Sequence, residues 1–286
     1  METPMSRIIP LAALALALGI PTAHAGSLFG SKKSSTPPKI AAKINHTVPQ
    51  ALLKDLAKAS QSGLSLSPPP GMQVYMKAIN GPRVAKGNKV GILYVGADFC
   101  PYCAGQRWAL VMTLLRFGHF KGVEYMASSP TDVYSNTPTF SFLHSTYTSK
   151  YVKFEAVETA DRMGHKLESM DKAQNAIFSK FDAPPYSPGY GSIPFVYVDG
   201  QYLVTRPMVS PNDLSGMDWE QIVASLNNPQ SNLFQSVMPQ INALTAAVCS
   251  LDGGDPDDVC SASGVMAANT ILYRMAQQGQ GSQQGK

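Results

Sequence analysis

The feature that most constrains the fold is an apolar run, Val90 to Ala97, that leads directly into Cys100-Pro101-Tyr102-Cys103. A near-continuous apolar run of this length is typical of a strand buried on both faces of a sheet. After the second cysteine, apolar residues recur at helical spacing to about Phe117, and Gly118 is a stop signal. The sequence therefore predicts a strand, a junction that carries both cysteines (the CPYC motif), and a mostly buried helix.

Further strand and helix signals alternate along the chain, which predicts an α/β fold. Residues 123–128 form a candidate second strand, which would complete a strand–helix–strand unit. Alternating patterns predict strands near Phe140 and over 152–156, and residues 171–181 look helical. Two β-rich runs, 195–198 and 201–204, flank Asp-Gly, which is the strongest short-range hairpin signal. An amphipathic helix over 219–226 follows.

The N-terminus has the pattern of a secretory signal peptide over residues 1–25. Arg7 precedes an apolar run, Ile8 to Ile20, and Ala23-His24-Ala25 is a small-x-small cleavage signature. The alternative is an uncleaved membrane anchor, but the run is shorter than the roughly 18 residues that a span needs. We expect a periplasmic or secreted protein with no stable membrane insertion after cleavage.

Extensions flank a main domain that we place at residues 72–227. Residues 26–71 read as a flexible extension with a short amphipathic helix, which a capping-box-like Thr47-Val48-Pro49-Gln50 opens and which ends before Gly63. Its apolar stripe could pair with a second subunit, but docking on the main domain is the simpler interpretation. The pattern over residues 228–276 predicts a pair of helices, the first of which is interrupted or kinked at Pro239. Residues 277–286 are expected to form a disordered tail.

Composition excludes one class of partner. The formal net charge is +4, and no cluster of basic residues is interleaved with aromatic ones. Nucleic-acid binding is therefore not expected. The histidines His46, His119, His144 and His165 show no metal-ligand spacing, so we expect neither a metal nor a cofactor.

Four cysteines in an exported chain permit disulfides. Of three possible pairings, the spacing favours Cys100 with Cys103 and Cys249 with Cys260. A structural disulfide at the second pair would stabilise the fold by about 3 kcal/mol in the chain-entropy model. The alternatives are a second redox pair there, or calcium binding by the aspartates between the two cysteines, whose spacing does not match an EF-hand loop.

Two cysteines at a strand-to-helix junction suit thiol–disulfide exchange. The helix N-terminus stabilises the Cys100 thiolate, which is the attacking species. Cys103 lies one turn on and would resolve the mixed disulfide, while Pro101 and Tyr102 would tune the reduction potential. The alternatives are haem attachment, which requires a His at 104 where the chain has Ala, a zinc site, and a plain structural disulfide.

Ile193-Pro194 precedes a predicted strand, and together with the CPYC motif it resembles the thioredoxin superfamily. The resemblance covers about 72–227, with an insertion before the proline. Glutaredoxins use the same Pro-Tyr dipeptide, but an exported chain with no evident glutathione site looks more like the periplasmic Dsb-type proteins. It implies a cis peptide at Pro194, backbone hydrogen bonds from Ile193 to an extended substrate, and metal exclusion by Pro194. The alternative is a trans proline that opens a strand. Residues 134–140 and 151–154 also resemble an uncharacterised thioredoxin-like family of bacteria and archaea.

One position departs from the pattern of the thioredoxin superfamily. Thioredoxins and many of their relatives carry a buried acid six residues before the first cysteine, where this chain has Tyr94. We expect Asp98 to be exposed and Arg107 to lie on a solvated helix face, so the proton acceptor for Cys103 stays open. The loop from Tyr186 to Tyr190 either lines a substrate groove or is a packed turn.

Two functional hypotheses follow. The first is an exported thiol–disulfide oxidoreductase that acts on cysteine-containing exported proteins and depends on a redox partner protein. The second is a non-catalytic binding or assembly module on the same scaffold, with the cysteines locked as a structural bridge. Oxidase, reductase and isomerase activity all remain open under the first hypothesis.

Overall fold

A mixed sheet of five strands forms the centre of the protein, in the order β1-β9-β8-β2-β7. The computed structural model describes residues 35–281, so the predicted signal peptide lies outside the described residues. β2 pairs in parallel with β7 and antiparallel with β8. The strands are β1 (Met76–Ala78), β2 (Val90–Gly96), β7 (Val152–Glu158), β8 (Phe195–Val198) and β9 (Tyr202–Val204). The predicted α/β class is confirmed at this level.

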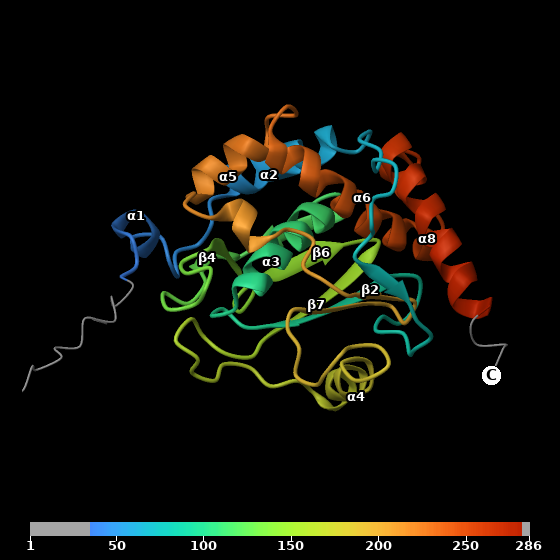
Figure 1. The fold of residues 1–286 in the computed structure, drawn as a ribbon, viewed down its shortest axis with the longest axis horizontal. Coiled ribbons are helices and arrows are strands. Elements are labelled where there is room, and N and C mark those ends of the chain that lie inside the picture. The colour runs from blue at the N-terminus through green and yellow to red at the C-terminus, as the bar shows by residue number, and fades with distance from the viewer. Residues whose placement is uncertain (1–34, 282–286) are drawn as a thin grey trace, which may run out of the picture. The chain divides into compact units, whose positions relative to one another are not determined.

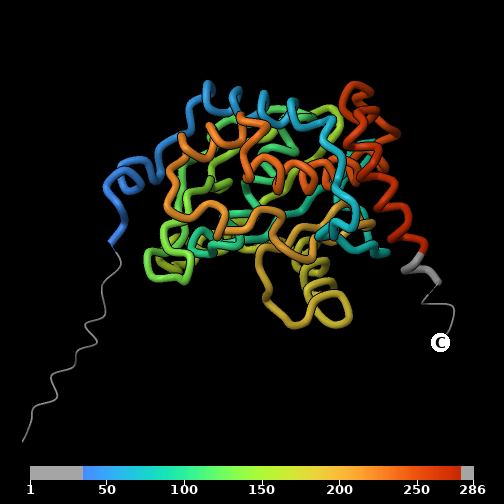
Figure 2. Tube along the Cα trace, turned by 45° about the horizontal axis from the view of Figure 1, so that its top comes forward, coloured from blue at the N-terminus to red at the C-terminus, as the bar shows by residue number. Residues whose placement is uncertain are grey.

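Strand β2 is buried along its whole length, as its apolar run predicts. Its side chains alternate between two cores: Ile92 and Tyr94 face the larger one, and Leu93 and Val95 the smaller one. The helix α4 (Lys172–Phe181) covers the smaller core and lies alone on its face of the sheet (Figures 1 and 2). The opposite face is covered by several helices (Figure 1).

The helices on that face come from distant parts of the chain. They are α2 (Gln50–Ser62), α3 (Pro101–Leu114), α5 (Trp219–Leu226) and α6 (Asn232–Asp252). The other helices of the described residues are the short α1 (Pro38–Ala41), η1 (Pro211–Leu214) and α7 (Asp257–Cys260) and the long α8 (Ser263–Gly281). The helix α8 continues into the stretch expected to be disordered, so that expectation is wrong as far as Gly281. Pro239 lies inside α6, which continues through it.

The predicted second strand does not join the central sheet. An insertion between α3 and β7 contains β3 (Gly118–Lys121), β4 (Glu124–Ala127), β5 (Pro138–Ser141) and β6 (Thr146–Ser149). These strands pair as β3-β6 and β4-β5. Two indole N–H groups fix β5, since Trp108 donates to the Pro138 carbonyl at 2.8 Å and Trp219 to the Thr139 carbonyl at 2.6 Å. The strand that follows α3 in the parallel unit is therefore β7.

The N-terminal helix α2 docks on this assembly, with Leu53, Leu56 and Ala59 in the larger core. The expected capping box is wrong, because Pro49 occupies the N-cap and no side chain caps the helix. Proline at that position fixes the backbone entry but leaves the helix without an acceptor. The helix ends before Gly63, as its pattern predicts.

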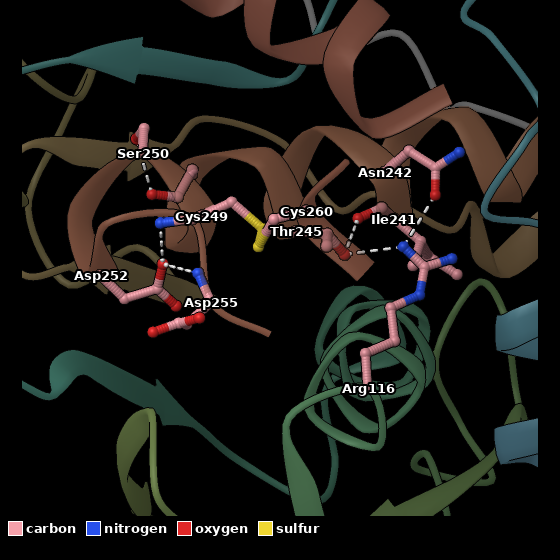
Figure 3. The surroundings of a disulfide bond; sticks show 11 residues. Arg116, Ile241, Asn242, Thr245, Cys249, Ser250, Asp252, Asp255 and Cys260 are labelled. Carbon is pink, nitrogen blue, oxygen red and sulfur yellow. Dashed lines mark hydrogen bonds between the residues drawn. A yellow bond between two sulfur atoms is a disulfide. The ribbon is translucent and has the colours of Figure 1, made fainter. Parts of the chain in front are cut away.

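The buried side chain of Arg116, just after α3, connects α3 with α2 and α6. Its guanidinium donates to Ser60 of α2. It also donates to Asn242 and Thr245 of α6 (Figure 3). Farther along α6, Cys249 forms a disulfide with Cys260 (Figure 3). The two extensions and the main domain thus share one core. Among the described residues, no helix combines the length and apolar character needed to cross a bilayer.

Candidate functional site

The CPYC motif forms the junction between β2 and α3. Cys100 is the N-cap of α3 and has extended backbone, and Pro101 occupies the first turn, where its missing N–H costs no hydrogen bond. The N–H of Cys103 donates to Cys100 Sγ at 3.2 Å. The sulfur therefore takes the place that a capping oxygen has in other helices.

The two cysteines differ in environment, and both are free thiols. Cys100 is 5% exposed, whereas Cys103 is fully buried. Hydrogen bonding from Cys103 lowers the pKa of Cys100 despite burial, and the Arg107 charge contributes in the same direction. Burial raises the pKa of Cys103. Cys100 is thus the thiol that ionises first and the one that solvent reaches.

The loop before β8 brings Ile193 to the cysteines. The Ile193 carbonyl oxygen lies 3.9 Å from Cys100 Sγ, and the Ile193–Pro194 peptide bond is cis. Both residues are partly exposed. The backbone at Ile193 is therefore available to a ligand that approaches Cys100.

Tyr102 is the exposed residue of the motif, at 44%. Its ring packs edge-on against Tyr134, with centroids 6.0 Å apart. The same loop is anchored next to the motif by the Ser129 N–H, which donates to the Phe99 carbonyl at 2.9 Å. Residues from 129 to 134 therefore border the cysteines on one side.

A buried charge cluster lies behind the motif, and it overturns two expectations. Arg107 is fully buried and Asp98 is 2% exposed, so neither faces solvent. Arg107 Nε donates to Glu158 at 3.0 Å, and its Nη2 donates to Asp98 at 3.1 Å and also to Glu158. Every residue of α3 except Tyr102 is buried, so the single charged residue of the helix must find its partners inside the protein.

Two carboxylates in this cluster face one cation. Asp98 also accepts a hydrogen bond from Ser141, and Glu158 accepts one from the Phe142 N–H. Within the described residues, Arg107 Nη1 and the buried Tyr94 hydroxyl have no partner. Burial, which outweighs the lowering effect of the Arg107 charge, and the neighbouring Glu158 charge together raise the pKa of Asp98 to about 7. A proton can therefore reside on Asp98 close to neutral pH.

This cluster supplies a buried acid where the sequence had shown only Tyr94. Tyr94 faces the same core as α3, and the Arg107 guanidinium lies 5.7 Å from its ring centroid. Cys103 and Arg107 are four residues apart on α3, a spacing that places side chains on one helix face. Sequence reasoning missed Glu158, although it ends β7 directly beside Gly96, where the carboxyl ends of parallel strands meet.

Replacing Asp98 with Asn should flatten the pH dependence of stability. Its pKa in the folded protein lies above its ordinary value of 3.8, so its protonation stabilises the fold at low pH and this contribution is lost as pH rises to about 7. We expect the free energy of unfolding of the wild type to fall across that window, and Asp98→Asn to remove most of the fall. Urea unfolding at a series of pH values measures it. Asp55→Asn, at an exposed carboxylate, is the control; an unchanged slope in Asp98→Asn would contradict the assignment.

The histidines and loop tyrosines that the sequence analysis considered make other contacts. His144 pairs with Glu124 and His165 with Asp161, both on the surface. Across residues 35–281, no group of His, Cys, Asp and Glu could hold a metal ion. Tyr186 packs against Phe181, whereas Tyr190 is 80% exposed.

Comparison with known proteins adds a partial match. Residues 75–187 match a family model described as a domain of unknown function, DUF929. The matched segment is less than half of the chain, and it contains the CPYC motif and the buried charge cluster but ends before Ile193. Neither the curated proteins nor the solved structures contain a match to the chain.

Proposed function

We propose that the protein is an exported thiol–disulfide oxidoreductase that acts on protein cysteines through Cys100 and Cys103. The observation that carries the proposal is the placement of Cys100 Sγ. It caps α3, accepts the Cys103 N–H at 3.2 Å and lies 3.9 Å from the Ile193 carbonyl. A thiolate at a helix N-terminus is a stabilised nucleophile, and a second thiol one turn on is suited to resolve its product.

We propose a thioredoxin-like core for the same region. A C-x-x-C motif beside a βαβ unit is typical of such redox proteins, and β2, α3 and β7 form a parallel unit with the motif at its first junction. β8 and β9 extend the sheet as an antiparallel hairpin that starts at Pro194. The insertion then lies between α3 and β7, and the two extensions cover α3 from outside.

The reaction conserves sulfur and electrons at each step. The Cys100 thiolate attacks one sulfur of a client disulfide, which forms a mixed disulfide and releases the other client sulfur as a thiolate. Cys103 then loses its proton and attacks Cys100 Sγ, which closes the Cys100–Cys103 disulfide and releases the second client thiol. The client is reduced and the CPYC pair oxidised; the reverse sequence oxidises a client dithiol. We propose the Asp98 carboxylate as the acceptor of the Cys103 proton.

The pH profile of Cys100 alkylation tests this proposal. We expect iodoacetamide to modify Cys100 with a midpoint below the roughly 8.5 of an ordinary thiol, because its pKa is lowered. The same protein should exchange with a small model disulfide. A midpoint at or above the ordinary value, together with no exchange, would contradict the enzyme.

A further inference from the structure

A cavity of about 420 Å³ opens beside Tyr102, on the exposed side of the CPYC motif. Its walls come from four parts of the chain: the segment before β1, the start of α3, the loop that follows β9 with η1, and α6. The residues that line it include Tyr75, Tyr102, Pro207, Met208, Pro211 and Val237. Its volume lies within the range of roughly 300–1,000 Å³ for ligand pockets. The C-terminal extension thus builds one wall of a cavity that Tyr102 of the CPYC motif also lines.

The wall of this cavity is fixed to the helix that carries the cysteines. Gln106 of α3 accepts the Met208 N–H at 3.0 Å. One residue earlier, Gly105 lets the loop approach so closely that a Cβ there would lie 2.0 Å from the Val209 carbonyl oxygen. The loop that lines the cavity is therefore held at a set position relative to α3.

Two charges of opposite sign line the cavity without partners of their own. Among the described residues, neither Arg206 nor Asp213 takes part in an ion pair or a side-chain hydrogen bond. The Arg206 guanidinium lies 6.0 Å from the Tyr75 ring centroid. By contrast, the Gln240 amide bonds to the backbone at Gln73 and Tyr75. Arg206 and Asp213 are thus the charged groups left for a ligand.

We propose that this cavity binds the polypeptide segment beside the client cysteine and selects an apolar side chain flanked by one acidic and one basic residue. The inference rests on the proposed exchange function. The aromatic and aliphatic walls bury the apolar side chain, Arg206 pairs with the client carboxylate, and Asp213 pairs with the client cation. Tyr102, which lies within the CPYC motif and lines the cavity, connects this segment to the exchange site.

Four model peptides test the inference, each joined by a disulfide to a small thiol next to an apolar residue. They carry an acid and a base, the acid alone, the base alone, or neither. We expect the wild type to have the highest kcat/KM for the first peptide. Arg206→Ala should lower kcat/KM for acid-containing peptides by roughly two- to fivefold, the range of an exposed ion pair, with little change for the neutral one. Asp213→Asn should do the same for base-containing peptides.

Arg206→Glu sharpens the result, because it should convert the preference for an acid into a preference for a base. Arg274→Ala, at an exposed arginine of α8, is the matched control and should leave all four rates unchanged. Uncharged 2-hydroxyethyl disulfide separates the two claims. If the wild type reduces it but shows no peptide preference that these variants change, the cavity is not a client site. If it exchanges with no disulfide at all, the proposed function fails and the inference with it.

Discussion

Cys100→Ser should reduce disulfide exchange to the uncatalysed rate, whereas Cys103→Ala should convert the protein into a trap. In the first variant no thiolate lies at the N-terminus of α3, and Cys103 is fully buried with a raised pKa, so it cannot substitute. In the second, Cys100 still attacks but nothing resolves its mixed disulfide. Exchange with a model disulfide measures the first effect, and non-reducing electrophoresis of Cys103→Ala with disulfide-bonded proteins measures the second.

The control is the double variant Cys100→Ser, Cys103→Ala, which should neither exchange nor accumulate mixed disulfides. All three proteins should give wild-type circular dichroism, since the cysteines are small residues at one helix terminus. Equal accumulation of mixed disulfides in the trap and in the double variant would contradict the assignment of Cys100 as nucleophile. So would wild-type exchange by Cys100→Ser.

Arg107→Met should destabilise the protein by about 3–5 kcal/mol, the cost of leaving buried charges without their partner. The guanidinium is the cation that bonds both Asp98 and Glu158, and all three side chains are at most 2% exposed. Its loss should also raise the pKa of Cys100, because the Arg107 charge helps to lower it. Urea unfolding measures the first effect and the alkylation profile of Cys100 the second.

A triple variant separates lost charge balance from lost packing. Adding Asp98→Asn and Glu158→Gln to Arg107→Met removes every charge of the cluster, so it should recover part of the lost stability. Arg274→Met on the surface should change the free energy of unfolding by less than about 0.5 kcal/mol. If the triple variant is no more stable than Arg107→Met, packing alone explains the loss.

Local patterns predicted the elements around the cysteines well. The apolar run of β2, the buried helix α3 and the Asp-Gly hairpin of β8 and β9 each follow from signals within a few residues. The partner of β2 does not. Residues 124–127 and 152–158 both look like strands, but the first pairs with β5, which Trp108 and Trp219 contact, and the second pairs with β2. Such long-range packing leaves no local pattern in the sequence.

The buried charges were missed because Asp and Arg are rarely buried, so exposure is the ordinary expectation. One signal was available. The helix that follows Cys100 is apolar all round, and Arg107 is its single charged residue. A helix of that kind is buried, and a buried arginine requires polar or charged partners close by. Asp98 and Glu158 stand where the ends of β2 and β7 meet beside it.

The reduction potential of the Cys100–Cys103 pair decides between an exchange site and a structural bridge. The protein is equilibrated in glutathione buffers of known potential, the free thiols are alkylated, and the peptide that contains residues 100–103 is quantified by mass spectrometry. The account predicts a potential between about −270 and −120 mV, the range of thiol–disulfide oxidoreductases. A pair that stays oxidised at potentials below about −300 mV, as structural disulfides do, would contradict it.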